Sequence, residues 1–555
     1  MKKLLKNKNL LFVVVAGLIL ALAFFVRIYN LDSVPKGFHI DEAIIADNAN
    51  SILKTGKDTN GNFLPLQTEQ FGDYNPTGYS YLDILPIKLF GMTIFAARIV
   101  AVVMGVLAVF SVMVLAYAFF ESRKISILAS LLFALSPWDI MFSRTAEETG
   151  VSIFFMVLGF GLLLLGVKRE KIKYILFSTL LLFISYFMYF TPRLFVPLMF
   201  LAFLLPIKFW ISKRKKLFTK VFVLCFIFLG LTAVLLVFGA RGGENRFNQV
   251  SIFGFPQTKL IMAEQIREDG VQHTPVTLTR TFHNKPLDYS FAFIQNYFQY
   301  FTGDFLFVQG GLPIWFRVPG MGLIYLVELP FILFGIYCLF KEKPKWAFLI
   351  LGWVLLAPVI SSLTVDDIPN VRRALIMAPA IELIAAFGFL RFTQNIPKKY
   401  KKITVIVILA IFSFNSLYFF HQLFVHQPVH KNWYRNDGFG EMLTQVKKDY
   451  PSYDEIVVTK SEGGIYPLVL FYTNYDPALY LSQGHPKDKT DTGFGKFFFV
   501  DNACPFLDRD PKVPNIKKTI YVENGNCRDD KKLDSVKYTN IYNTSGVKVF
   551  RIVYD

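Results

Sequence analysis

LLFVVVAGLILALAFF, residues 10–25, is a run of aliphatic and aromatic residues without a single charge. Ile153–Val167 and Val221–Phe238 repeat the pattern. Each block is about as long as the helix needed to cross roughly 30 Å of hydrocarbon. Because every backbone polar group must find a partner inside the lipid, such blocks form helices. The chain is therefore predicted to be a polytopic α-helical membrane protein.

The overall composition agrees with a membrane protein. Of 555 residues, 53% are hydrophobic, 17% are aromatic and only 18% are charged, which is low for a soluble chain of this length. The net charge of +18 raises nucleic-acid binding as an alternative. The Lys and Arg residues, however, gather in short gaps between apolar blocks, which is the positive-inside pattern, with an added attraction to anionic lipids. We therefore expect membrane lipids as partners and no nucleic acid.

About eleven transmembrane helices are predicted, and the gaps between them alternate in charge. One set of gaps is short and basic, which marks it as cytoplasmic, and the N-terminus belongs to this set. An odd number of spans then places the C-terminus outside the cell. The predicted spans are 10–28, 96–119, 125–142, 150–167, 173–190, 194–209, 221–238, 321–340, 346–363, 374–392 and 403–424.

The outer gaps have the room for chemistry. Residues 1–424 are predicted to form the transmembrane domain, with long outer loops at 29–95 and 239–320. The second of these loops is long enough to form amphipathic helices over an active-site cavity. The cytoplasmic gaps are too short to hold a catalytic domain, so we expect the active site on the outer face.

The C-terminal region, residues 425–555, is predicted to be a small extracytoplasmic domain. Short β-like runs alternate there with turn signals, which indicates an α/β or mostly β fold. The region contains Cys504 and Cys527. In an oxidising compartment the two could form a disulfide, although their spacing alone leaves this open.

The first candidate site is His39-Ile40-Asp41-Glu42-Ala43, shortly after the first span. Asp41 and Glu42 are adjacent carboxylates at a predicted helix start near the membrane surface. A glycosyl transfer needs a base that takes a proton from the acceptor hydroxyl, and a low-dielectric neighbourhood raises the pKa of a carboxylate toward that task. The alternative is structural: Asp41 caps the helix and Glu42 favours its positive end.

Two further outer segments, residues 71–82 and 143–149, carry candidate substrate-lining residues. Aromatic rings in the first segment suit sugar stacking, or else an interfacial aromatic belt. The second segment is a charged turn between two spans, although any such turn needs some polar residues. Together with the first site, the substrate-lining candidates are His39, Asp73, Tyr74, Tyr79 and Glu147.

Several arginines lie on the outer side, where positive charge is disfavoured. Arg193 is the only charge between its two spans, and Arg372 and Arg373 lie at the outer end of a predicted span. A buried guanidinium near the membrane needs an anionic partner, and lipid phosphate accepts its paired donors well. The alternatives are snorkelling, or ion pairs with carboxylates such as Asp366. The candidates for donor-phosphate binding are Arg193, Arg372, Arg373 and Arg144.

The sequence also limits the type of donor. It has no Walker A motif and no GxGxxG after a strand, and an outer-face enzyme has no ready access to nucleotide sugars. A lipid-linked donor is therefore favoured. His421, His426 and His430 raise metal binding as a further alternative, but Pro428 interrupts the helical spacing of the last two.

Taken together, these segments resemble the GT-C class of membrane glycosyltransferases. The resemblance is to the bacterial protein O-mannosyltransferase and aminoarabinose transferase superfamily, which is similar to glycosyltransferase family 39. It runs most clearly from Gly37 to about Gly159. The matching pieces are His39-Ile40-Asp41-Glu42-Ala43, Tyr74-Asn75-Pro76-Thr77-Gly78-Tyr79, Phe90-Gly91, Ala97-Arg98, Leu135-Ser136-Pro137, Phe142-Ser143-Arg144, Asp304-Phe305-Leu306-Phe307, Pro319-Gly320-Met321-Gly322 and Arg372-Arg373-Ala374.

The resemblance implies a GT-C membrane bundle with a catalytic acid in the first outer loop, a polyprenyl-phosphate sugar donor and an inverting transfer. By position, Asp41 is the base and Glu42 is a second candidate or an orienting group. The family often has a basic residue before two prolines where this chain has Asn75-Pro76-Thr77, so no donor contact is carried over there. No cofactor is assigned, and a divalent metal stays an open alternative because metal dependence varies within the class.

The predicted function is therefore a hexosyl- or pentosyltransferase in the cell membrane. It moves a sugar from a polyprenyl-phosphate donor to a lipid, glycan or protein acceptor on the extracytoplasmic face. The alternatives are a lipid-glycan transporter or flippase, and a surface polysaccharide polymerase that uses a lipid-linked oligosaccharide.

Overall fold

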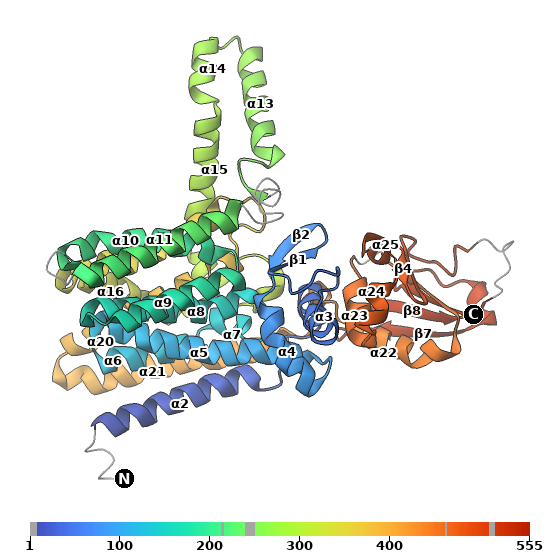
Figure 1. The fold of residues 1–555 in the computed structure, drawn as a ribbon, viewed down its shortest axis with the longest axis horizontal. Helices are drawn as coiled ribbons and strands as arrows, with labels where there is room; N and C mark the ends of the chain where they lie inside the picture. The colour runs from blue at the N-terminus through green and yellow to red at the C-terminus, as the bar shows by residue number, and fades with distance from the viewer. Residues whose placement is uncertain (1–7, 212–215, 239–249, 461–462, 485, 510–516) are drawn as a thin grey trace.

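The computed structural model describes residues 8–211, 216–238, 250–460, 463–484, 486–509 and 517–555. Long helices lie side by side in a bundle, and a sheet domain formed by the C-terminal region caps one end of it (Figure 1). A helical arm leaves the bundle near the same end. The polypeptide between the first two long helices lies between the bundle and the sheet domain.

Each predicted span overlaps a helix of the bundle. Six helical segments are long and apolar enough to cross a membrane: 8–28, 94–120, 148–169, 216–237, 344–362 and 398–426. Because the remaining helices are shorter or more polar, the number of crossings stays a prediction. The bundle helices are α2 (Lys8–Ile28), α5 (Ile94–Phe120), α6 (Arg123–Leu135), α7 (Pro137–Phe142), α8 (Glu148–Arg169), α9 (Ile172–Met188), α10 (Thr191–Ile211), α11 (Lys216–Phe238), α16 (Leu329–Glu342), α17 (Pro344–Leu356), α18 (Val359–Ser362), α20 (Met377–Asn395) and α21 (Lys398–His421).

Two predicted spans need correction. The range 125–142 is divided into α6 and α7 at Ser136, because Pro137 has no N–H to continue the helix and instead begins the next one. The range 321–340 begins as turns and a short 3₁₀ helix, η3 (Leu326–Glu328), before α16 starts at Leu329.

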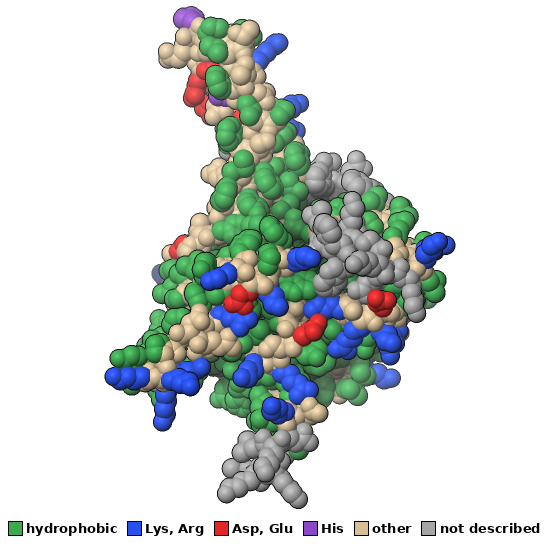
Figure 2. Space-filling view, turned by 90° about the vertical axis from the view of Figure 1, so that its left-hand side faces the viewer, with side chains coloured by type: hydrophobic (Ala, Val, Ile, Leu, Met, Phe, Trp, Pro, Cys, Tyr) green, Lys and Arg blue, Asp and Glu red, His purple; other side chains and the backbone are tan. Residues whose placement is uncertain are grey.

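The two ends of the bundle differ in charge. Figure 2 looks onto the end opposite the sheet domain and shows Lys and Arg side chains gathered there. Of the predicted basic gaps 2–8 and 208–220, residues 2–7 and 212–215 lie outside the described residues. The structure therefore separates a basic end from the end with the C-terminal domain, as positive-inside topology requires. Which end faces the cytoplasm stays a prediction.

The C-terminal region forms a mixed sheet with helices packed against it. The strand order is β4-β5-β3-β6-β8-β7, with β3 parallel to both β5 and β6. A disulfide joins Cys504 to Cys527. The elements are α22 (Phe439–Asp449), β3 (Glu455–Thr459), α23 (Tyr466–Thr473), α24 (Pro477–Ser482), α25 (Pro486–Asp491), β4 (Gly493–Phe494), β5 (Phe497–Val500), β6 (Thr519–Asn524), η7 (Lys531–Ser535), β7 (Lys537–Tyr542) and β8 (Lys548–Tyr554).

The first outer segment packs between the bundle and the sheet domain. It contains α3 (Ile40–Thr55), the hairpin of β1 (Gln67–Gln70) and β2 (Asp73–Pro76), and α4 (Gly78–Phe90). A single hydrophobic core contains side chains from α3 and α5 together with those of the sheet domain. Because α3 is buried on both sides, its N-terminus is held rigidly at the junction of the two domains.

The second outer segment forms the helical arm, made of α13 (Pro256–Val271), α14 (Val276–Phe282) and α15 (Lys285–Gln299). The helices agree with the sequence-based expectation, and their place over an active-site cavity stays a prediction. Several residues between 309 and 320 of the same segment line the cavity described below. The arm points away from α3 and from the sheet domain (Figure 1).

Candidate functional site

The candidate site is built around the first turn of α3. His39 is the N-cap: its Nδ1 accepts the backbone N–H of Asp41 at 3.2 Å, and its own N–H donates to Glu42 Oε2 at 3.2 Å. This reciprocal capping box satisfies two helix donors that otherwise have no partner. The cap predicted for Asp41 is therefore supplied by His39, and the Asp41 carboxylate is left to other contacts.

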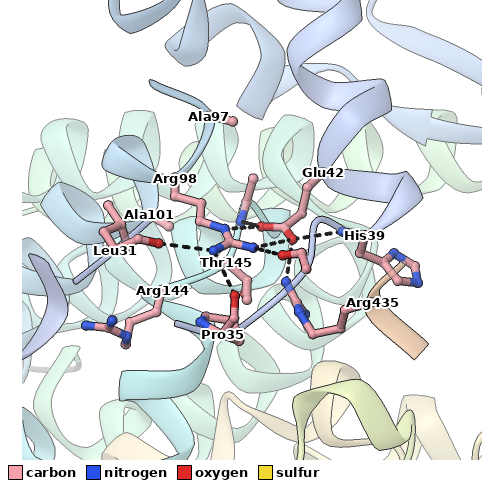
Figure 3. A network of polar contacts seen from close by, with 12 residues as sticks. Leu31, Pro35, His39, Glu42, Ala97, Arg98, Ala101, Arg144, Thr145 and Arg435 are labelled. Carbon is pink, nitrogen blue, oxygen red and sulfur yellow. Dashed lines mark hydrogen bonds and ion pairs between the residues drawn. The ribbon is translucent and has the colours of Figure 1, made fainter. Parts of the chain in front are cut away.

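Glu42 is buried, with a side chain 3% exposed, and is the centre of an ion network (Figure 3). Arg98 Nε and Nη2 donate to its two oxygens at 2.8 and 3.0 Å, and Arg435 Nη2 donates to Oε2 as well. The backbone N–H of Ala146 completes the set at 2.9 Å. Burial alone would raise the pKa of Glu42, but the two guanidinium groups lower it from 4.5 to about 2. Glu42 is thus a permanent anion with every lone pair engaged.

The network joins three parts of the chain that are far apart in sequence. Arg98 comes from α5 and also donates to the carbonyls of Leu31, Pro35 and Gly37. Arg435 ends a 3₁₀ helix, η5 (Asn432–Arg435), at the start of the C-terminal domain. Gly37 has φ +82°, and a Cβ there would lie 2.2 Å from the Arg435 carbonyl oxygen, so only glycine fits.

Asp41 is adjacent to Glu42 but has a different environment. Its side chain is 37% exposed, and its Oδ2 lies 3.7 Å from Nη1 of Arg372 and 3.5 Å from Nδ1 of His39. Arg372 Nε also lies 3.1 Å from Glu147 Oε1, so the guanidinium is shared by two carboxylates. Burial raises the pKa of Glu147, and Arg372 opposes that rise. The structure therefore brings together the predicted residues His39, Asp41, Glu147 and Arg372.

A cavity of about 160 Å³ is lined by two residues that contact the site, although the four predicted residues of the site do not line it themselves. Its wall includes Trp315, whose ring stacks on His39 at 4.6 Å, and Arg435, which holds Glu42. Arg317 and Lys431 add two further cations, and none of the described residues that line it is acidic. A small concave space with cationic side chains and an aromatic wall is suited to an anion such as a phosphate.

Arg193, Asp73 and Tyr74 lie elsewhere. Arg193 is buried in α10, where it donates to the carbonyls of Tyr186 and Leu236 at 3.0 and 3.3 Å. With Tyr74 it lines a separate cavity of about 1100 Å³ beside the β1–β2 hairpin, and Asp73 is on that hairpin. Neither Asp41 nor Arg372 lines this cavity, so the predicted pairing of Arg193 with the first site is not seen.

Three other candidates make contacts within the fold, and their role toward substrate or phosphate stays a prediction. Arg144 donates to five backbone carbonyls between residues 26 and 34 and points away from Glu42 (Figure 3). Arg373 donates two hydrogen bonds to the carboxylate of Asp366, at 3.0 and 2.7 Å. This ion pair is the alternative to phosphate binding that the sequence left open. The fully buried Tyr79 donates to the carbonyl of Ala97 at 2.9 Å and so fastens α4 to α5.

Sequence reasoning missed the cations that the tertiary structure adds to the site. In the sequence, Arg98 is marked only as part of a resembling motif, and no pattern marks Arg317, Lys431 or Arg435. Arg435 lies 393 residues after Glu42, and a lone arginine in a polar tail carries no local signal. The only hint was the Trp and Tyr pair that precedes it, which is common in interfacial segments.

The described residues include no group of three or more His, Cys, Asp or Glu side chains arranged to hold a metal ion. At the candidate site, Asp41 and Glu147 are the two carboxylates that approach the same group. A guanidinium, that of Arg372, already lies between their oxygens. The residues present therefore do not fit a divalent cation in the arrangement seen.

The chain is similar to known proteins in both sequence and structure. Residues 75–237 match the model of the family described as dolichyl-phosphate-mannose-protein mannosyltransferase. A comparison with curated proteins gave no match. Among solved structures, ArnT from Cupriavidus metallidurans in the apo state is matched over 99% of this chain and 98% of that chain, with a TM-score of 0.54 and 12% identity. The chain has a GT-C fold.

Two more structures share the GT-C fold. The same ArnT bound to undecaprenyl phosphate gives a TM-score of 0.55 at 12% identity, over 98% of this chain and 97% of that chain. The archaeal oligosaccharyltransferase AglB from Archaeoglobus fulgidus, in complex with an inhibitory peptide and a dolichol-phosphate, gives 0.50 at 13% identity. That match covers 84% of this chain but only 64% of the AglB chain. The GT-C likeness thus extends over the bundle and the C-terminal domain together.

Proposed function

We propose that this protein is a glycosyltransferase that moves a sugar from a polyprenyl-phosphate donor to an acceptor on the extracytoplasmic face of the membrane. The observation that carries the proposal is the position of Asp41. Its carboxylate is partly exposed and is held between His39 and Arg372. His39 stacks on Trp315, which lines a cavity together with Arg317, Lys431 and Arg435. The candidate base and the candidate anion-binding space are thus connected through the stacked rings of His39 and Trp315.

The fold relatives support a lipid-linked donor. The ArnT structure holds undecaprenyl phosphate, and the AglB structure holds a dolichol-phosphate. The description of the matching family names dolichyl-phosphate-mannose. A donor of this chemistry presents a phosphate at the membrane surface while its prenyl chain stays in the lipid, which suits a cationic cavity at the end of a helical bundle.

In the proposed reaction, the acceptor hydroxyl oxygen attacks the anomeric carbon and its proton passes to Asp41. The bond between that carbon and the phosphate oxygen breaks, and the electron pair leaves with the polyprenyl phosphate. Arg317 and Lys431 meet the charge that grows on the phosphate, where fixed cations stabilise the transition state more than the ground state. Arg372 positions Asp41, because its guanidinium is itself fixed by Glu147.

Asp41 is a better base than Glu42. Glu42 has a pKa of about 2 and all of its acceptor sites engaged by Arg98, Arg435 and two backbone N–H groups, so it cannot take a proton near neutral pH. Its role is the orienting one: it fixes the first turn of α3 against α5 and the C-terminal domain. Asp41 is then presented at the surface of a rigid helix.

The experiment compares cells that lack the protein with cells that carry it as wild type, Asp41→Asn or Asp32→Asn. Polyprenyl-phosphate sugars and envelope glycans are measured by mass spectrometry. Asp32 is an exposed carboxylate in the same outer segment and serves as the matched control. Removing a general base lowers a rate by roughly 10²–10⁴-fold, so Asp41→Asn should accumulate the donor and lose one sugar, as the deletion does.

Three results would contradict the proposal. Asp41→Asn protein that restores the sugar would remove Asp41 from the chemistry. A missing oligosaccharide, with a lipid-linked oligosaccharide accumulating, would favour a polymerase. Purified protein that moves the lipid across liposomes without transferring its sugar would favour a flippase.

A further inference from the structure

The helical arm exposes an apolar face that nothing in the described chain covers. In α15, the side chains of Leu287, Phe291, Ile294 and Phe298 are all exposed, Phe291 to 64%. Their spacing places them on one side of the helix. None of the residues of α15 is buried. The neighbouring helices continue the pattern with exposed Leu260, Ile261, Ile266, Val271, Val276, Leu278 and Phe282.

The base of the arm is fastened at the end of a membrane-crossing segment. Asn296 Nδ2 donates to the carbonyls of Ser362 and Thr364 at 3.3 and 3.0 Å. The hydroxyl of Tyr297 donates to the carbonyl of Leu355 at 2.9 Å. Because the apolar segment of residues 344–362 ends at this point, the arm leaves the bundle at the boundary between lipid and water.

The direction of the arm follows the plane of a membrane. Its helices run across the bundle helices at a steep angle and project to one side (Figure 1). If the bundle crosses the membrane along its length, the arm lies along the surface. Figure 2 shows apolar side chains continuing from the arm onto the flank of the bundle. Helix α15 has 15 residues, so at a rise of 1.5 Å per residue it is about 22 Å long.

We propose that the arm is a membrane-surface anchor, with the apolar stripe of α15 embedded among the lipid acyl chains on the side of the C-terminal domain. An amphipathic helix that lies in the interface buries one face by a few ångströms while its polar face stays in water. The partner is the lipid bilayer itself. The proposal is independent of the reaction that the protein performs.

The charge of the arm indicates whether it is held by the lipid headgroups or by the apolar acyl chains. Attraction to anionic headgroups requires an excess of Lys and Arg over Asp and Glu. The arm has no such excess, because its basic and acidic residues are equal in number. Insertion should therefore depend on apolar burial and be the same in neutral and in anionic lipid. Residues 256–299 contain four basic side chains, Lys259, Arg267, Arg280 and Lys285, and four acidic ones, Glu264, Glu268, Asp269 and Asp288.

The test places a fluorescent label at single cysteines in the full chain. Phe291→Cys lies on the stripe, and Lys285→Cys is the matched control, because Lys285 is exposed on the other side of the same helix. Both labelled positions are at the surface, so folding is retained. The two free cysteines of the wild type, Cys225 and Cys338, are buried, and unmutated protein measures their background labelling. The label is NBD, whose emission rises and shifts to the blue in apolar surroundings.

The labelled proteins are studied in nanodiscs of phosphatidylcholine, with and without nitroxide-bearing lipid. We expect blue-shifted emission at position 291 that the nitroxide lipid largely quenches, and water-like, unquenched emission at position 285. Adding anionic lipid should leave both unchanged. Equal, water-like emission at the two positions would overturn the proposal. Protected emission at 291 that the nitroxide lipid fails to quench would also overturn it, because a protein surface, such as a second copy of the chain, would then cover the stripe.

Discussion

Glu42→Gln tests whether the ion network holds the two domains together. The substitution keeps the size of the side chain but removes the negative charge between Arg98 and Arg435, both of which are buried. The pKa of Glu42 is lowered from 4.5 to about 2, and a difference of about 2.5 units corresponds to about 3 kcal/mol of stability. Removing one partner from a buried ion pair typically costs about 3–5 kcal/mol. The two arguments agree, so we expect a loss of about 3 kcal/mol.

The sign of the pH dependence follows from the lowered pKa. The contribution of Glu42 is complete above pH 4.5 and is lost as the pH falls toward 2. At pH 7 the free energy of unfolding of the wild type should therefore exceed that of Glu42→Gln by the full amount of about 3 kcal/mol. This difference in stability should shrink as the solution is acidified. Equilibrium unfolding by sodium dodecyl sulfate in mixed micelles, followed by circular dichroism, measures the free energy of unfolding at each pH.

Glu121→Gln is the matched control. It removes the partner of Lys168 at 3.1 Å, but this carboxylate is 65% exposed at the basic end of the bundle. Ion pairs of this kind contribute about 0–1 kcal/mol because water and salt screen them. If Glu42→Gln and Glu121→Gln lower stability equally, or if the effect of Glu42→Gln is independent of pH, the network does not join the domains as described.

Four more predictions follow from single contacts. Trp315→Ala should slow sugar transfer even where the variant stays folded, because it removes the ring stacked on the capping His39, while the lost packing also lowers the free energy of unfolding; a wild-type transfer rate in the folded variant would contradict this. Arg144→Ala should lower the free energy of unfolding by about 3 kcal/mol or more, since buried carbonyls lose their donors, and a loss below about 1 kcal/mol would count against it. Replacing both Cys504 and Cys527 by Ala should destabilise the C-terminal domain by about 3 kcal/mol, as expected for a loop of this length; dithiothreitol that leaves wild-type unfolding unchanged would refute this. Washing with EDTA should leave transfer intact, because Arg372 lies where a cation would sit; restoration by added metal would disprove it.

The helical bundle was predictable from the sequence. Apolar blocks such as Leu10–Phe25 determine helices locally, since lipid leaves the backbone no other way to satisfy its hydrogen bonds. The errors came where local chemistry changes inside a block. Pro137 divides one predicted span, and the start of α16 at Leu329 shortens another. Both helices, α7 and α16, begin with a proline in the first turn, Pro137 and Pro330, which the hydropathy of the block does not mark.

The candidate site was predictable only in part. His39 to Glu42 carried a signal because carboxylates at a helix start beside a membrane are unusual. Arg144 and Arg373 were assigned to phosphate because an outer-face guanidinium has the same local signature whether it binds a ligand, a carboxylate or backbone carbonyls. The structure separates these cases by showing the acceptors.

By itself, the sequence determined that the chain is a bundle of apolar helices and that a carboxylate pair follows the first of them. Only the tertiary structure decided which carboxylate is held as an anion and which stays open to solvent. It did so because Arg98 and Arg435, from segments far apart in the chain, both reach Glu42 and leave Asp41 to Arg372. Charges separated by hundreds of residues interact strongly only when the fold brings them close together, since salt screens exposed charges beyond a Debye length of roughly 8–10 Å.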